Sequence, residues 1–183
     1  MPRYAALLRG VNVGRGPRVA MADLRALLGR LGFAEVSTLL NSGNAVFTAT
    51  GRDSAVMARR IAAALEHELD APVPVIVVAG AHVATAVAEN PFPSADPSRL
   101  LLAFAQERET LRQIEPGIRA VLGKPDAFAV GSAVAYLHCP GGIARSKAAE
   151  ALLGRAGRGA TTRNLATARR LADAIGATPR RPA

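Results

Sequence analysis

The sequence predicts an α+β protein made of two subdomains with the same order of strands and helices. Short apolar runs alternate with longer stretches in which apolar residues recur every three or four positions, as expected for strands and helices respectively. The order of these runs in the first half returns in the second, after a proline-rich segment at residues 90–97. Hydrophobic residues fill 50% of the 183 positions, which is ample for a core.

The first half opens with an apolar strand at residues 3–8, which ends at a glycine-rich loop at residues 9–16. An amphipathic helix follows, and Gly32 ends it. Two strands, at residues 36–40 and 45–49, form a hairpin around a turn at residues 41–44. The remaining elements are a helix capped by Asp53 or Ser54, a strand at residues 75–79 and a short helix at about residues 82–89.

The second half repeats this order. Its predicted elements are a strand at residues 100–104, a helix at 107–120 broken near Pro116, a hairpin of strands at 127–130 and 133–138, a helix at 147–153, a strand at 160–162 and a helix at 165–175. Strand, helix, strand, strand, helix, strand is the split βαβ pattern of ferredoxin-like domains. We therefore predict a tandem duplication of ferredoxin-like subdomains at residues 1–92 and 93–176. Each is an antiparallel sheet with helices on one face, and residues 177–183 form a disordered tail.

The net charge, the hydrophobic pattern and the cysteine content limit the partners, location and metal sites that the protein can have. The net charge is +9, and Lys124 and Lys147 are the only lysines among 23 basic residues. A basic surface attracts phosphates and nucleic acid, but a GC-rich genome also favours arginine, and the sequence leaves both explanations open. No apolar run approaches the roughly 20 residues of a membrane span, which predicts a cytoplasmic protein without a membrane partner. With one cysteine and three scattered histidines, no disulfide, metal site or cofactor is predicted.

Polar loops gather at one end of each predicted sheet. The split βαβ order places the glycine-rich loop beside the turn at residues 41–44. In the second subdomain it places residues 139–147, which leave the third strand, beside Arg163 and Asn164, which leave the fourth. If the two polar ends face each other, they form a cleft between the subdomains, a common place for a ligand.

The leading hypothesis is a binding module for a small anionic or phosphate-bearing molecule in that cleft. Guanidinium and amide groups next to glycine-rich backbone suit the recognition of carboxylates and phosphates. The candidate ligand contacts are Arg9, Asn12, Asn41, Asn44, Lys147, Arg163 and Asn164. The alternative for the asparagines is turn or helix-cap chemistry, and for the arginines a solvated or paired structural charge.

Two other functions remain open. An enzyme could act at the same cleft, with Ser146 and Lys147 as nucleophile and base, although Ser146 is better placed as a helix N-cap. A nucleic-acid module is the third hypothesis, because RNA-recognition domains use the same plait with aromatics on its first and third strands. Here those strands supply only Tyr4 and Phe47, so such binding would depend on the phosphate backbone and on salt. The sequence identifies no catalytic residue and leaves the oligomeric state open.

Several segments resemble one bacterial family. The segments are residues 4–14, 21–28, 40–47, 146–147 and 161–164, and the opening block and the Asn-Ser-Gly-Asn turn are the most specific of them. They are similar to the uncharacterised family known as domain of unknown function 1697, and the resemblance extends from about residue 3 to about residue 176. It implies two ferredoxin-like subdomains, and it implies no established activity, ligand or catalytic residue.

Overall fold

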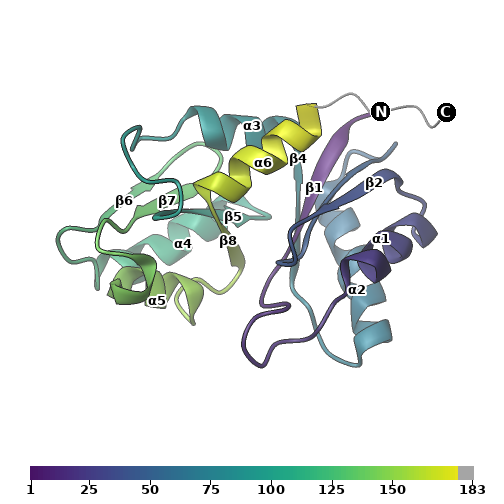
Figure 1. Ribbon diagram of the computed structural model, residues 1–183, viewed down its shortest axis with the longest axis horizontal. Helices are drawn as coiled ribbons and strands as arrows, with labels where there is room; N and C mark the ends of the chain where they lie inside the picture. Colours follow the sequence, from purple (N-terminus) through teal and green to yellow (C-terminus); the bar gives the residue numbers. More distant parts are fainter. Residues whose placement is uncertain (177–183) are drawn as a thin grey trace. The chain divides into compact units, whose positions relative to one another are not determined.

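Two four-stranded antiparallel sheets, each packed against helices, make this an α+β protein (Figure 1). The computed structural model describes residues 1–176, so the predicted tail at 177–183 lies outside the described residues. Contacts between Cα atoms divide the described chain into two compact units. The first comprises residues 1–80 together with 170–176, and the second comprises residues 81–169.

The first unit contains a sheet with the strand order β2-β3-β1-β4. Its elements are β1 (Arg3–Leu8), α1 (Met21–Arg30), β2 (Ala34–Leu39), β3 (Asn44–Thr48), α2 (Ser54–Leu69) and β4 (Val75–Ala79). Strand β3 lies antiparallel between β2 and β1, with Asn44 opposite Leu7 and Thr48 opposite Arg3. The loop that follows β1 and the turn that follows β2 therefore share one end of the sheet, as the sequence predicts.

Side chains at alternate positions along β1 and β3 face the same side of the sheet and form the core of the first unit. Tyr4, Ala6 and Leu8 point to the same side as Phe47, and α1 and α2 pack their apolar stripes against them. The Tyr4 and Phe47 rings are stacked 5.9 Å apart and are 3% and 0% exposed. The two aromatics that a nucleic-acid platform would need are thus part of the core.

The second sheet has the equivalent order, β6-β7-β5-β8. The elements after β4 are α3 (Gly80–Ala88), β5 (Leu100–Ala105), α4 (Arg108–Arg119), β6 (Ala127–Val130), β7 (Ala135–His138), the 3₁₀ turn η1 (Ile143–Arg145), α5 (Lys147–Leu153), β8 (Ala160–Asn164) and α6 (Leu165–Gly176). Pro116 lies inside α4 without breaking it, contrary to the prediction. Its own carbonyl still accepts a hydrogen bond from the Ala120 amide at 3.0 Å, so the helix continues beyond it.

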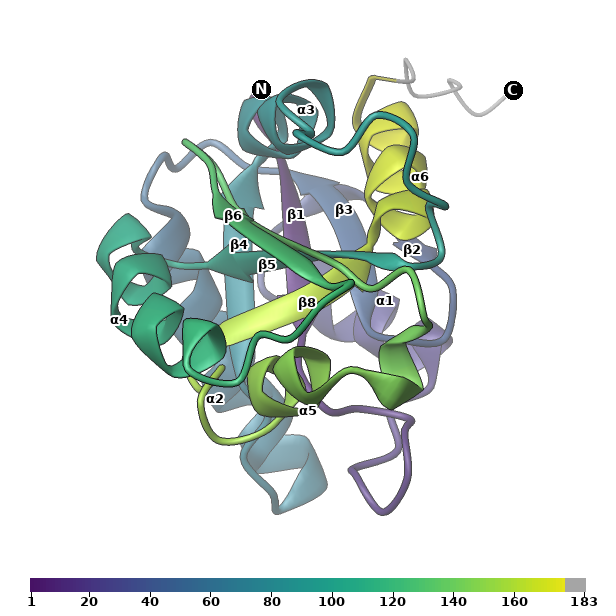
Figure 2. The same cartoon turned by 90° about the vertical axis from the view of Figure 1, so that its left-hand side faces the viewer.

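Helix α3 departs from the predicted arrangement of helices on one face. The Tyr136 hydroxyl donates to the Ala86 carbonyl at 2.9 Å, and the His82 ring lies 6.5 Å from the Phe104 ring. Tyr136 and Phe104 alternate with the residues of β7 and β5 that face α4 and α5, so α3 covers the opposite face of this sheet (Figures 1 and 2). The prediction of helices on one face is wrong for this unit, because α3 places its buried residues Val83 and Ala86 against that second face. Among residues 1–176, no helix is both long and apolar enough to span a membrane.

Candidate functional site

The connection between β1 and α1 is much longer than its counterpart in the second unit. Residues 9–20, called the glycine loop below, join β1 to α1, whereas Gln106 and Glu107 alone join β5 to α4. The β1–α1 and β5–α4 connections occupy equivalent places in the two sheets, and the short β5–α4 connection shows that such a sheet can form without a long loop there. The glycine loop is therefore an addition to the first unit that the sheet itself does not require.

Asn12 holds the glycine loop closed. Its side-chain Oδ1 accepts a hydrogen bond from the Val19 amide at 2.9 Å, and its Nδ2 donates to the Val19 carbonyl at 2.8 Å and to the Asn41 carbonyl at 2.7 Å. The backbone of Asn12 is in the left-handed region, with φ +58°, which asparagine tolerates better than most residues. These contacts confirm that the loop lies beside the turn, and they show that the Asn12 amide shapes the loop.

The turn between β2 and β3 is built around Asn44, which is fully buried. Its Nδ2 donates to the Leu39 carbonyl at 3.0 Å and to the Ser42 hydroxyl at 2.9 Å. The Leu8 amide donates to the Gly43 carbonyl at 2.8 Å, which ties the end of β1 to the turn. For Asn44 the structure favours the alternative of turn chemistry. Arg9 is half-buried beside this turn, with its backbone amide on the Pro74 carbonyl at 2.9 Å.

An open hollow of about 530 Å³ lies between the glycine loop and the turn. We call it the loop hollow, and it is lined by Asn12, Arg18, Val19, Ala20, Met21 and Asn41. Ala20 occupies the N-cap position of α1 and provides no side-chain cap, so the amides of the first helical turn are left for another acceptor. Arg18 is exposed and donates one hydrogen bond, to the Gly14 carbonyl at 3.3 Å. Asp23, in the first turn of α1, is the acidic group nearest to this helix end in the sequence.

The predicted polar residues of the second unit also gather at one end of their sheet. In β5, Leu100 pairs with His138 of β7 and Leu101 with Asn164 of β8, which places the start of segment 139–147 at the same sheet end as Asn164. Both Arg163 and Asn164 lie within β8, and not after a strand ending at residue 162. The Asn164 Oδ1 accepts from the Thr167 amide at 2.9 Å and so caps α6.

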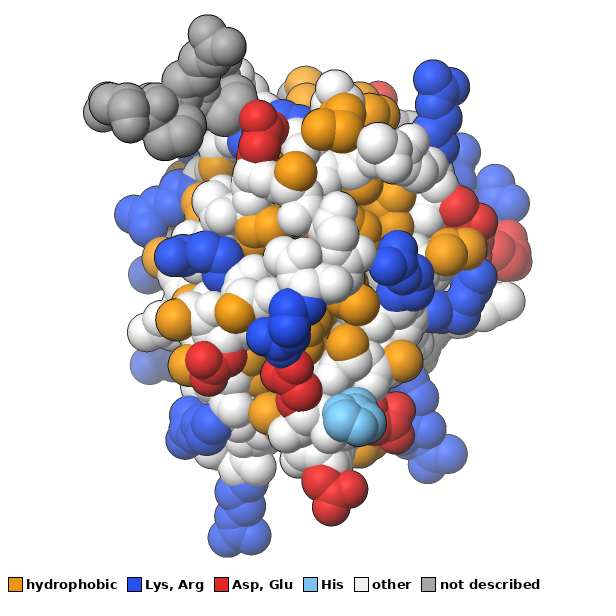
Figure 3. Space-filling view, turned by 90° about the vertical axis from the view of Figure 1, so that its right-hand side faces the viewer, with side chains coloured by type: hydrophobic (Ala, Val, Ile, Leu, Met, Phe, Trp, Pro, Cys, Tyr) orange, Lys and Arg blue, Asp and Glu red, His pale blue; other side chains and the backbone are white. Residues whose placement is uncertain are grey.

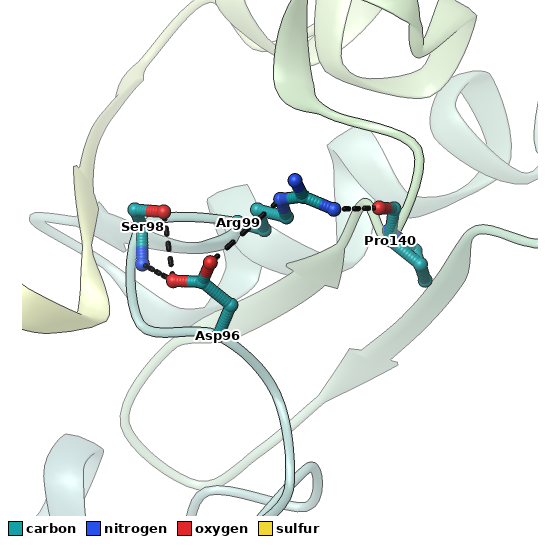
Figure 4. A network of polar contacts seen from close by, with 4 residues as sticks. All are labelled: Asp96, Ser98, Arg99 and Pro140. Atoms are coloured by element: carbon teal, nitrogen blue, oxygen red, sulfur yellow. Dashed lines mark hydrogen bonds and ion pairs between the residues drawn. The ribbon is translucent and has the colours of Figure 1, made fainter.

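A network of polar contacts fixes the segment that precedes Lys147 (Figure 4). Arg99 donates to the Pro140 carbonyl and lies 3.7 Å from Asp96. Asp96 accepts hydrogen bonds from the Ser98 hydroxyl and amide at 2.7 and 2.8 Å, which lower the pKa of its carboxyl group. The segment after β7 is therefore tied to the residues that open β5.

Ser146 and Lys147 have the arrangement expected of a helix start. The Ser146 Oγ accepts a hydrogen bond from the Ala149 amide at 2.9 Å, which confirms Ser146 as the N-cap of α5. The Lys147 side chain is exposed. Cys139 is fully buried, and burial raises the pKa of its thiol, which keeps it in the unreactive protonated form. These contacts give no support to a serine nucleophile paired with Lys147.

Arg163 is the buried cation of the second unit, with 8% of its surface exposed. Its Nη1 donates to the Thr161 hydroxyl at 3.1 Å and to the Thr162 carbonyl at 2.7 Å. Burial lowers the pKa of its guanidinium from 12.5 to about 10. A fall of this size corresponds to a cost of about 3 kcal/mol for keeping the charge inside. The hydrogen bonds to Thr161 and Thr162 offset part of this cost.

Because replacing a buried charged group by an apolar side chain of similar size is often stabilising, Arg163→Met is expected to raise the free energy of unfolding by about 1 kcal/mol. The folded state holds this proton less tightly than the unfolded state. The cost of the charge is thus fully present below the folded pKa of about 10 and declines as the pH rises through it. Denaturant unfolding between pH 6 and 9 should give the same gain throughout, and Arg158→Met, at an exposed position, should change stability by less than about 0.5 kcal/mol. A loss of stability in Arg163→Met would contradict the account.

Comparison with known proteins places the chain in a family. The family model described as protein of unknown function (DUF1697) matches residues 1–136. The chain belongs to this family. A solved structure of the conserved bacterial protein SP0830 from Streptococcus pneumoniae is similar to this DUF1697 chain, with a TM-score of 0.80 and 23% sequence identity. The match covers 95% of this chain and 98% of the other, and at this identity it shows the fold alone. No curated protein matches.

In this DUF1697 protein the residues predicted as ligand contacts fall into two groups, one in each unit. Arg9, Asn12, Asn41 and Asn44 lie in the first unit, and Lys147, Arg163 and Asn164 lie in the second. The assignment of these two sets to one site stays a prediction. Arg18 and Met21 also line the loop hollow, and neither is among the ligand contacts predicted from the sequence. A basic residue just before an uncapped helix start was the signal that could have indicated Arg18.

Proposed function

We propose that this protein binds a small anionic or phosphate-bearing ligand at the loop hollow. The observation that carries the proposal is the uncapped start of α1 opening beside the Arg18 side chain. Free amides at a helix N-terminus and a guanidinium both favour an anion. Together they attract it by their positive charge and orient it through directional hydrogen bonds. Asn41, whose side chain is exposed beside them, supplies an amide for a ligand hydroxyl or phosphate oxygen.

The scaffold we propose for this site is the ferredoxin-like fold, present once in each unit. The strand orders β2-β3-β1-β4 and β6-β7-β5-β8 support it, because each places the first and third strands of a split βαβ pattern at the centre. On this scaffold the glycine loop is the element that distinguishes the first unit from the second, which is where a function added to a duplicated fold is expected. Participation of Arg9, Lys147 and Arg163 stays a prediction from the sequence.

Binding of inorganic phosphate and pyrophosphate, measured by isothermal titration calorimetry, tests the proposal. Arg18→Ala is expected to weaken pyrophosphate binding about tenfold, because a charge-assisted hydrogen bond is lost. Arg15→Ala is the matched control, since Arg15 is an exposed arginine of the same loop that does not line the hollow. It should change the dissociation constant by less than about twofold. Equal losses in both variants, or no saturable binding, would overturn the proposal.

Nucleic-acid binding is the alternative that the same measurement separates. The face of the protein that carries α1 shows arginine side chains dispersed among acidic and apolar ones, without a continuous basic stripe (Figure 3). Binding to a nucleic-acid backbone would weaken steeply as salt rises, because it releases counterions from several phosphates. A short RNA that binds more tightly than pyrophosphate at low salt and loses this advantage at moderate salt would favour that alternative.

A further inference from the structure

A second hollow lies at the other end of the first sheet. It has a volume of about 220 Å³ and is lined by residues 31–33, which follow α1, by residues 49–53, which follow β3, and by the first turns of α2. Thr48 ends β3 opposite Arg3, the first residue of β1, whereas the glycine loop begins after Leu8 at the far end of the same strand. The two hollows are therefore separated by the length of β1.

The inner wall of this hollow is apolar. Phe33, Ala49 and Met57 line it and are 7%, 7% and 4% exposed, so each belongs to the core and presents only one edge to the hollow. The Phe33 ring packs on the Phe47 ring at 4.4 Å, which fixes its orientation. A ligand that enters here must bring an apolar body to replace water on this wall.

The rim of the hollow is charged. The Arg60 guanidinium lies over the Phe33 ring at 5.6 Å and donates one hydrogen bond to the Leu31 carbonyl at 2.9 Å, which leaves further N–H groups of its fork for an acceptor. Within residues 1–176 the Arg52 side chain has neither a hydrogen bond nor an ion pair. Asp53 is the acidic member of the rim, and its Oδ1 accepts the hydrogen bond from the Val56 amide that caps α2.

We propose that this hollow binds a small carboxylate with an apolar, preferably aromatic, body. Arg52 and Arg60 are placed to receive the carboxylate, and the body packs on Met57 and the edge of Phe33. A single negative charge is favoured over a phosphate dianion for two reasons. Asp53 repels additional negative charge, and the apolar wall has no hydrogen-bond donors for the phosphate oxygens. The volume restricts the ligand to a small molecule, below the usual range for drug-sized ligands of about 300 to 1,000 Å³.

Titration with phenylacetate, followed by NMR or calorimetry, tests this inference. Binding of phenylacetate should reach saturation at ligand concentrations up to about 10 mM. The neutral phenylacetamide should bind about tenfold more weakly. Arg52→Ala should weaken phenylacetate binding about tenfold without changing Tm, since within residues 1–176 no hydrogen bond or ion pair of the Arg52 side chain holds the fold. Arg60→Met should weaken it similarly and also lower Tm, because it removes the bond to Leu31.

The control is Arg59→Met, an exposed arginine of the same helix that does not line the hollow, which should leave phenylacetate binding unchanged. Arg18→Ala should also bind phenylacetate normally, so that failure of the loop hollow and failure of this site are distinguished. Equal affinity for phenylacetate and phenylacetamide, wild-type affinity in Arg52→Ala, or the absence of saturable binding would each overturn the inference.

Discussion

Gly43→Ala is expected to lower the free energy of unfolding by about 2 to 4 kcal/mol, a large part of the 5 to 15 kcal/mol typical of a folded protein. Gly43 has φ +74°, and a left-handed backbone costs a residue with a Cβ about 1 kcal/mol. The added Cβ would also lie 2.6 Å from the Val11 Cγ2 and 2.7 Å from the Leu8 Cβ. Because the turn, β1 and the glycine loop meet at this point, relief of the overlap must separate them, at about 1 to 3 kcal/mol.

Gly32→Ala is the matched control for this prediction. Gly32 has φ +83°, but an added Cβ would meet nothing within 4 Å. The substitution should therefore cost only the backbone component, about 1 kcal/mol. Chemical denaturation of the two variants measures both costs, and their difference isolates the close approach between the turn and the glycine loop. Equal losses in the two variants would contradict the packing described at Gly43.

The order of elements could be predicted from the sequence because local signals fix it. Apolar periodicity distinguished strands from helices, and Asp53, Ser146 and Gly32 marked helix ends through chemistry that acts within a few residues. The face covered by α3 could not be predicted, because nothing in an almost wholly apolar helix indicates which of two sheet faces it covers. Similarly, Arg163 and Asn164 extend β8 through pairing with β5, and this long-range contact outweighs their polar character.

The sequence predicted that the glycine loop lies beside the turn, but it did not predict the roles of the residues there. The strand order alone placed the glycine loop beside the turn, and the bond from Asn12 to the Asn41 carbonyl confirms it. An asparagine in a loop can serve a ligand or its own backbone with the same amide, and only the positions of its partners decide between the two. Asn12, Asn44 and Asn164 all have backbone partners, whereas Arg18 was overlooked because its significance depends on the uncapped α1 beside it.

Asn12→Ala is expected to lower the free energy of unfolding by about 1 to 2 kcal/mol. It removes two part-buried hydrogen bonds, to the Val19 amide and carbonyl, and one exposed hydrogen bond, to the Asn41 carbonyl. It also places alanine at φ +58°. Asn41→Ala is the control, because Asn12 bonds only to the Asn41 backbone, and it should change stability by less than about 0.5 kcal/mol in denaturant unfolding.

The same pair of variants separates a residue that shapes the loop from one that touches the ligand. Asn12 closes the loop around the start of α1, so Asn12→Ala should weaken pyrophosphate binding together with stability. Asn41→Ala leaves the loop closed, so any loss of pyrophosphate affinity in that variant reports a direct contact. Loss of binding in Asn12→Ala at wild-type stability would contradict the role described for Asn12, because its amide would then act on the ligand itself.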